Sequence, residues 1–408
     1  MDAATPVQAA RVAGLDWATR LHAVCVLDPD GQVRARFEVP HTGKDLRGLT
    51  RRLAKLNVTR IAIERPDGPV VEALLGAGLQ VVVIASRQVK ALRTRYGSAG
   101  NKDDRFDAYV LADVLRTDTH RLVPLRPDSP ETAALRAVSR ARKALVEQRV
   151  ALANQLRANL LVALPAAVTL FAEVDSPISL AFLRRFPSVE RAAWLTPARM
   201  AGWLRRAGYC GRTDPAELYQ RLRAAPDGLT GPHGEARAAV TASLVTTLDT
   251  VRAQISELDG DIVERLATHT DQHTFTSLPR SGQVRAAALL AEIGDCRQRF
   301  PDPESLACLA GAAPSTRASG QHRAVTFRFA CDKQLRNAVM DFAGDSRHAN
   351  PWAAHVYHQA RARGHRHPHA VRILARAWLR VIWRCWQDHT TYDPTRHGAY
   401  QRLTTQQT

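Results

Sequence analysis

The pattern of apolar and polar positions in the first third of the chain predicts an α/β domain. Strand-like runs at 12–16, 21–27 and 32–39 open the chain, and Asp28-Pro-Asp-Gly31 separates the last two. A turn sequence of this kind between two apolar runs is typical of a hairpin. Residues 32–39 alternate between apolar and polar side chains, as an edge strand does. The pattern therefore predicts three antiparallel strands before the first helix.

Helices and buried strands alternate over the rest of this region. Apolar runs at 60–64 and 80–84 predict two more strands, buried on both faces. Helical spacing of apolar residues predicts helices over 44–56, 70–75, 87–95 and 104–116. The order βββαβαβα is that of the ribonuclease-H-like fold, in which the first strand lies beside the fourth.

Carboxylates stand at the ends of two predicted strands and at the start of the last helix. Asp16 and Glu64 end the first and fourth strands, and Asp104 and Asp107 are three residues apart, so they share one helix face. In a ribonuclease-H-like domain all four would converge. They could then hold two Mg²⁺ ions, or Mn²⁺ in their place, which orient a nucleophile and stabilise a phosphodiester leaving oxygen. Any one of these acids alone is equally well explained as a surface or capping residue.

The actin-like fold of sugar kinases and ATPases also begins with a strand followed by an aspartate. That fold needs glycine-rich turns that bind phosphate, whereas Asp16 is followed by Trp17-Ala-Thr. The ribonuclease-H-like fold is therefore the better prediction.

Two long helices dominate the middle of the chain. One is predicted over 131–164 and the other over 235–266. The second has apolar residues in alternating steps of four and three, which is a heptad seam: Leu244, Leu248, Val251, Ile255, Leu258 and Ile262. We expect an antiparallel coiled-coil arm with short helices at its tip. Scaffolding, dimerisation and nucleic-acid contact through the arginines of the first helix all remain open as its role.

The last third is predicted to be mainly helical. Leu278-Pro-Arg-Ser-Gly282 before an Ala/Leu-rich helix resembles a helix-hairpin-helix element, whose turn can offer backbone N–H groups to a DNA phosphate. Further on, Ser319 precedes a glycine in a predicted loop between Arg317 and Arg323, and arginines can grip phosphate with two hydrogen bonds each. A serine held there could attack phosphorus, although spacing alone favours an inert loop residue. Lys333 and Arg336 follow in a basic helical stretch, and with Arg317 and Arg323 they are the residues expected to bind nucleic acid. The expected domains are 1–128, 129–272 and 273–408.

Charge indicates the kind of partner. The chain has 57 Lys and Arg against 39 Asp and Glu, a net charge of +18, which favours nucleic acid. No lipidation motif or long apolar run suggests a membrane partner. The six cysteines have no paired spacing, so we expect reduced thiols, and neither a zinc site nor a disulfide framework. Together with the absence of a signal peptide, this predicts a cytoplasmic, nucleoid-associated protein.

Taken together, these motifs resemble DEDD-class transposases of bacterial insertion sequences over nearly the whole chain. Those recombinases have an N-terminal domain like the Holliday-junction resolvase RuvC, and some are guided by a bridge RNA. The motifs are Gly14-Leu-Asp16, Ile63-Glu64, Lys102-Asp-Asp-Arg-Phe-Asp-Ala108, Leu278-Pro-x-x-Gly with Ala291-Glu-Ile-Gly-Asp295, and Gly311-x-x-Pro314 with Ser319-Gly320.

The resemblance implies that Asp16, Glu64, Asp104 and Asp107 bind Mg²⁺ and that Ser319 attacks DNA to form a covalent phosphoserine. The serine would act in trans with the acids of another subunit, in a dimer or tetramer. DNA and a structured guide RNA are the implied partners. A RuvC-like metal-dependent nuclease or junction resolvase with a purely structural Ser319 is one alternative. A non-enzymatic DNA-architectural protein is another.

Two positions depart from the family pattern. Asp103 stands where the family usually has a small hydroxyl residue, so Asp103 and Asp107, at i and i+4, remain an alternative pair of ligands. The Lys/Gly-rich turn that usually follows the serine is replaced here by Arg328-Phe-Ala-Cys-Asp-Lys333. Phosphate contacts at that turn are therefore not carried over from the family.

Overall fold

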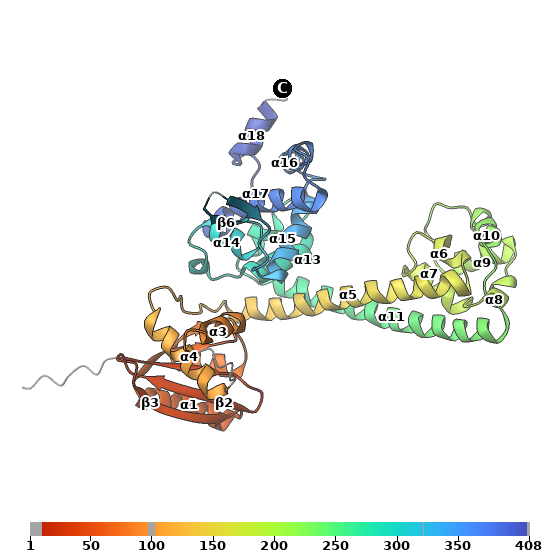
Figure 1. The fold of residues 1–408 in the computed structure, drawn as a ribbon. Helices are drawn as coiled ribbons and strands as arrows, with labels where there is room; N and C mark the ends of the chain where they lie inside the picture. The colour runs from red at the N-terminus through yellow and green to blue at the C-terminus, as the bar shows by residue number, and fades with distance from the viewer. Residues whose placement is uncertain (1–9, 97–102, 321, 406–408) are drawn as a thin grey trace, which may run out of the picture. The chain divides into compact units, whose positions relative to one another are not determined.

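The computed structural model describes residues 10–96, 103–320 and 322–405 (Figure 1). The chain forms two compact units, which divide between Pro127 and Asp128. All six cysteines are free thiols, as expected. Within the described ranges, no helix is both long and apolar enough to cross a bilayer.

The N-terminal unit is built on one five-stranded sheet with the order β3-β2-β1-β4-β5. β1 pairs antiparallel with β2 and parallel with β4, β2 pairs antiparallel with β3, and β4 pairs parallel with β5. The strands are β1 (Arg11–Asp16), β2 (Leu21–Leu27), β3 (Val33–Pro40), β4 (Val58–Ile63) and β5 (Gln80–Val83). The first strand therefore lies beside the fourth and residues 33–40 form an edge strand, which confirms the predicted ribonuclease-H-like fold.

Helices cover both faces of this sheet. They are α1 (Gly43–Lys55), α2 (Pro69–Gly76), α3 (Ser86–Arg93) and α4 (Asp104–Thr117). Apolar residues of α1 and α2 share a core with Leu15 and Val24 on one face. On the other face α3 and α4 pack on Ala62 and Val82. Each buried strand thus needs apolar side chains on both faces, which explains the continuous apolar runs in the sequence.

Helix α4 packs closely on the central strand β1, and a glycine permits this approach. A Cβ atom at Gly14 would lie 2.5 Å from the backbone nitrogen of Ala112 and 2.8 Å from Cβ of Leu111, and closer still to the carbonyl oxygen of Ala108. Real Cβ atoms do not approach other atoms so closely. Gly14 therefore sets the distance between β1 and the helix that carries Asp104 and Asp107.

A buried histidine makes the stability of the N-terminal unit depend on pH. His22 on β2 is fully buried; its Nδ1 accepts a hydrogen bond from the Ala18 amide (3.2 Å), and its Nε2 lies 2.8 Å from Nδ1 of His41. Burial, and then the nearby His41, lower the pKa of His22 from 6.5 to about 4. The neutral ring is thus favoured in the folded state, so protonation favours unfolding.

We expect the free energy of unfolding of this unit to fall by roughly 3 kcal/mol between pH 6.5 and pH 4 through His22 alone. Above pH 6.5 this loss of stability is absent, because the histidine is then neutral in the unfolded state too. Hydrogen exchange of the β1 and β2 amides, corrected for intrinsic exchange rates, measures it. His22→Asn removes the titration, so its stability should depend less on pH over this range. An equally steep pH dependence in the variant would contradict the prediction.

Two long helices of the second unit, α5 (Pro130–Ala163) and α11 (Gly231–Ala267), run antiparallel and side by side (Figure 1). Arg142 pairs with Asp259, and Nδ2 of Asn159 donates to Thr241 (2.9 Å). Four seam residues of α11 are buried: Leu248, Val251, Ile255 and Ile262. The heptad spacing thus correctly predicted the face along which α11 meets α5.

Five short helices at the tip of this arm enclose a separate core. They are α6 (Ala166–Leu170), α7 (Pro177–Arg185), α8 (Val189–Ala193), α9 (Pro197–Arg206) and α10 (Pro215–Ala224). Phe182, Met200 and Leu218 fill that core. The short helices expected at the tip are therefore present.

The C-terminal region is mainly helical, with one small β-hairpin. Its elements are α12 (Gln272–Thr276), α13 (Gly282–Ile293), η1 (Arg297–Arg299), α14 (Pro303–Leu309), β6 (Ser315–Ser319), β7 (His322–Thr326), α15 (Lys333–Ser346), α16 (Pro351–Ala362), α17 (His367–Gln387) and α18 (Gly398–Thr405). α12 and α13 pack on each other around a turn in which Arg280 and Gly282 both have φ 56°, consistent with the expected helix-hairpin-helix-like element.

One apolar core joins the C-terminal helices to the base of the arm. Trp378 and Trp386 of α17 are fully buried in it, together with Leu135 of α5 and Ile262 of α11. This shared core explains why 128–408 form one compact unit. The expected domain division at 272/273 stays a prediction.

Candidate active site

Three elements of the N-terminal unit bring acidic side chains to one edge of the sheet. Asp16 is the last residue of β1, and Glu64 directly follows β4. Because Leu15 lies opposite Ile63 in the parallel ladder, both carboxylates emerge at the same edge. The first turn of α4 adds Asp104 and Asp107.

The acids gather around a cavity of about 730 Å³. Carboxylate oxygens of Asp16, Glu64 and Asp107 lie within 4.8 Å of one another, with Asp107 buried and the other two half-buried. Asp104 lines the same cavity but is exposed and outside this cluster. The structure thus brings three of the four predicted acids together and places the fourth at the rim.

Ser319 lies in the second unit, at the tip of the β6–β7 hairpin. Its backbone pairs with His322, and Gly320 between them has φ 56°, which suits a tight hairpin turn. The serine side chain is exposed. We predicted a loop here, but the segment forms strands because Ser315–Ser319 and His322–Thr326 can pair once Gly320 turns the chain.

The four predicted nucleic-acid-binding residues lie in this hairpin and at the start of the helix that follows it. Arg317 and Arg323 belong to β6 and β7, but their side chains lie outside the described part of the structure. Lys333 is exposed at the first position of α15, and half-buried Arg336 follows one turn later. Lys333 and Arg336 line one cavity.

Comparisons with known proteins identify the family. A family model described as "Transposase" matches residues 13–165, and one described as "Transposase IS116/IS110/IS902 family" matches residues 272–358. The "Mini-circle putative transposase for IS117" of Streptomyces coelicolor is 31% identical over 95% of this chain and 96% of its own length. The chain belongs to the IS116/IS110/IS902 transposase family.

A second relative agrees with this assignment. The "Insertion element IS900 uncharacterized 42 kDa protein" of Mycobacterium paratuberculosis is 30% identical over 79% of this chain and 80% of its own length. A chain of the solved structure "T. thermophilus RuvC in complex with Holliday junction substrate" aligns with 28% of this transposase and 99% of its own length, at 15% identity and a TM-score of 0.23. Because that score is low, the fold assignment rests on the observed strand order.

Family membership confirms the resemblance drawn from the motifs. It supports an enzyme that acts on DNA, and it disfavours a purely architectural protein. The matched ranges contain all the acids of the cavity and also Ser319, Lys333 and Arg336.

The donor atoms of the acidic cluster fit a divalent metal ion. Three carboxylates in close contact repel one another, and a hard cation with oxygen ligands removes that repulsion. Asp16, Glu64 and Asp107 supply only oxygen donors, close enough for one ion to bind all three. The DEDD-type fold of the transposase and this cluster together imply a divalent metal.

Arg93 is a residue of the site that sequence analysis missed. From α3 its Nε and Nη2 atoms donate to the two carboxylate oxygens of Asp107. This bidentate pair offsets the negative charge of the buried carboxylate. Each oxygen keeps a second lone pair, so Asp107 can also bind a cation. Nothing in the sequence distinguishes Arg93 from the many other arginines, because its role depends on how α3 packs beside α4.

The structure gives Asp103 and Asp104 different positions. Asp103 is the N-cap of α4, where its Oδ1 accepts a hydrogen bond from the Arg105 amide (3.1 Å). Asp104 instead lines the acidic cavity. Capping of α4 thus explains the aspartate at position 103 without a role in metal binding. This arrangement favours Asp104 over Asp103 as the third acid.

Proposed function

We propose that this transposase excises and inserts an insertion sequence by Mg²⁺-dependent strand cleavage and exchange through a covalent phosphoserine–DNA intermediate. Asp16, Glu64, Asp104 and Asp107 hold the metal, and Ser319 is the nucleophile. The observation that carries the proposal is the cluster of Asp16, Glu64 and Asp107, built from three distant segments of a transposase-family chain.

The chemistry of the serine step balances without any further reactant. Oγ of Ser319 forms a bond to phosphorus and gives up its proton, while the bond between phosphorus and one deoxyribose oxygen breaks and that oxygen takes up a proton. In the second step a deoxyribose hydroxyl of another strand attacks the phosphoserine and releases the serine hydroxyl. The bound metal supplies Lewis-acid stabilisation of the developing charge. The exposed hairpin tip leaves room for a DNA strand to reach Ser319.

Basic side chains near the hairpin bind the DNA backbone. Arg317 and Arg323 flank Ser319 in sequence, and Lys333 and Arg336 begin the following helix. The net charge of +18 supplies further contacts to DNA and to a structured guide RNA. Binding should therefore weaken steeply as salt concentration rises.

The active centre is completed in trans, by the acids of one subunit and the serine of another in a dimer or tetramer. The acids and Ser319 belong to two separate compact units of the chain. Mixing two inactive proteins, Asp16→Asn and Ser319→Ala, tests this arrangement. Restored cleavage in the mixture is expected, and a mixture that stays inactive would argue for a site within one subunit.

We expect Ser319→Ala to lower formation of a covalent protein–DNA adduct by at least about a thousand-fold, as loss of a catalytic nucleophile does. The adduct is trapped on labelled element-end DNA with Mg²⁺ and any RNA that copurifies with the protein, then resolved under denaturing conditions. Ser315→Ala is the matched control, because Ser315 lies on the same strand but at the base of the hairpin.

Each of the other possible outcomes would contradict this proposal and support a different function. An adduct that survives Ser319→Ala would overturn the serine role. Strand nicking without any adduct would support the RuvC-like nuclease. Failure to cleave, with DNA binding unaffected by Asp16→Asn, would support an architectural protein. Sequencing of the copurified RNA tests the guide-RNA component separately.

A further inference from the structure

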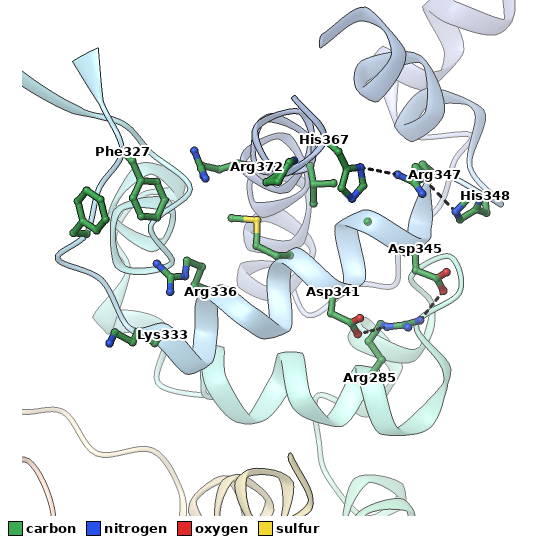
Figure 2. Close-up of a pocket in the computed structure, with 15 residues that line it drawn as sticks. Arg285, Phe327, Lys333, Arg336, Asp341, Asp345, Arg347, His348, His367 and Arg372 are labelled. Atoms are coloured by element: carbon green, nitrogen blue, oxygen red, sulfur yellow. Dashed lines mark hydrogen bonds and ion pairs between the residues drawn. The ribbon is translucent and has the colours of Figure 1, made fainter. Parts of the chain in front are cut away.

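A second cavity, of about 980 Å³, lies in the C-terminal region between α15, α17 and the segment that follows β7. Figure 2 shows Phe327, Arg336 and Arg372 gathered at one end, with Arg285, Asp341 and Asp345 at the other. Lys333 lies near the aromatic end. The cavity therefore has a cationic, aromatic end and an end rich in ion pairs.

The carboxylates that line this cavity are already neutralised. Arg285 binds Asp341 and Asp345, both at 2.8 Å, and Arg280 binds Asp345 at 3.0 Å. By contrast, Lys333, Arg336 and Arg372 form no ion pair with a carboxylate of the described residues. The excess charge of the cavity is thus positive, and Lys333, Arg336 and Arg372 contribute it at the aromatic end.

Two of these cations converge on one aromatic ring. The guanidinium carbons of Arg336 and Arg372 lie 5.5 Å and 4.1 Å from the ring centre of Phe327. Burial, and then repulsion from Arg336, lower the pKa of the Arg372 guanidinium from its usual value. Two guanidinium groups that lie near the same ring and form no ion pair with a carboxylate of the described residues are a favourable site for a phosphate group.

A second ring at this end is open to solvent. Phe329 is 80% exposed, and its ring lies 4.8 Å from that of Phe327 at an angle of 88°. An exposed aromatic face beside unpaired cations is the combination by which proteins bind unpaired nucleotides, since the base stacks on the ring while the cations bind the backbone. In double-stranded DNA the bases are stacked on one another and cannot reach such a ring.

We infer that this cavity binds one unpaired nucleotide of the DNA strand on which Ser319 acts, with its phosphate between Arg336 and Arg372 and its base against Phe329. The inference rests on the proposed function for the choice of DNA strand. Phe327 directly follows β7, whose first residue pairs with Ser319 and whose last pairs with Ser315. These pairs are four residues apart, roughly 13 Å along the strand. That separation is on the order of four nucleotide steps in a stacked strand.

The test compares single-stranded and duplex DNA in the full-length protein. All variants carry Ser319→Ala and are kept in EDTA, so that no chemistry occurs. Phe329→Ala and Phe329→Leu should weaken binding of a single-stranded oligonucleotide roughly ten-fold, whereas Phe329→Tyr should retain it. Duplex binding should stay within about two-fold, because no unpaired base is available. Val325→Ala is the matched control, since Val325 is 62% exposed on the neighbouring strand β7 but does not line the cavity.

A fluorescent base analogue, 2-aminopurine, reports stacking directly. Its emission in the single strand should be quenched by the protein that retains Phe329 and by the Phe329→Tyr variant, and not by Phe329→Leu. Arg372→Gln should lower the slope of log affinity against log salt by about 0.7, the contribution of one phosphate contact on a single strand. Equal losses on duplex and single strand, or unchanged quenching in Phe329→Leu, would overturn the inference. An effect seen only with the RNA version of the oligonucleotide would overturn the assignment to DNA.

Failure of this inference is distinguishable from failure of the proposed function. If Phe329→Ala binds single strands normally while wild type still forms the Ser319 adduct, only the nucleotide site is wrong. If quenching behaves as expected but no adduct forms, only the serine chemistry is wrong.

Discussion

Asp107→Asn should lose DNA strand cleavage by a factor of about a thousand or more and bind Mn²⁺ at least about ten-fold more weakly. A metal ion contributes several kcal/mol of charge stabilisation to phosphodiester cleavage, and about 4 kcal/mol corresponds to a thousand-fold. Loss of residues that merely support metal ligands costs 10- to 100-fold in affinity or activity, so loss of a direct ligand should cost at least as much. Asp107 is the most buried of the three clustered acids, so water replaces it poorly.

The same change should also destabilise the N-terminal unit modestly. Arg93 would lose one of its two hydrogen bonds, and the other would go to a neutral amide oxygen instead of a carboxylate. A hydrogen bond to a charged group contributes about 1.5–3 kcal/mol. The Arg93 side chain is 24% exposed, so it can turn partly towards water, and we expect a loss near the lower end of that range.

Two measurements separate these effects. Electron paramagnetic resonance of free Mn²⁺ gives the metal affinity, and cleavage of labelled DNA at saturating Mg²⁺ gives the activity. Glu38→Gln is the matched control, because Glu38 is an acid of the same unit that pairs with exposed Arg105 at 2.9 Å and does not line the acidic cavity. Unchanged Mn²⁺ affinity in Asp107→Asn would show that the cluster is not a metal site.

Gly14→Ala should destabilise the N-terminal unit by about 3 kcal/mol and reduce cleavage about a hundred-fold or more. The added methyl group would collide with backbone atoms of α4, which cannot move aside as a flexible side chain can. The helix must therefore shift, and it carries Asp104 and Asp107 away from Asp16. A displacement of about 1 Å at a catalytic site can cost a hundred-fold in rate.

Gly48→Ala is the control for this prediction. Gly48 lies within α1 of the same unit, and a Cβ there would meet nothing within 4 Å. That variant should be more stable than wild type by about 0.5–1 kcal/mol, because alanine loses less backbone entropy in a helix. Hydrogen exchange of β1 and α4 amides measures both variants. Wild-type protection of α4 in Gly14→Ala would show that the close approach does not position the helix.

The strand order of the N-terminal domain follows from local patterns in the sequence. Apolar runs, one turn signal and helical spacing are enough to predict βββαβαβα, since each depends only on neighbouring residues. Because parallel neighbours end at the same edge of a sheet, this order also predicts that Asp16 and Glu64 meet. The heptad steps of α11 likewise identified the face that packs on α5.

Local sequence patterns could not predict the contacts between elements. Arg93 forms an ion pair with Asp107, and Gly14 lies against α4, only because helices α3 and α4 pack on the sheet at a particular distance and angle. The sequence predicted a loop where the structure has the hairpin that carries Ser319. Its two strands are short and polar, and they are stabilised by pairing with each other, which a local pattern does not reveal. The aromatic end of the second cavity depends on Arg336 and Arg372 from two different helices.

The sequence by itself therefore determined the order of the elements, the acids at the strand ends and a polyanionic partner. The tertiary structure decided which acids form a cluster, which arginine neutralises it and where unpaired cations face an open aromatic ring. The physical reason is that local propensity and periodicity act over a few residues. Charge pairing and close packing depend on distances between segments that are far apart in the chain.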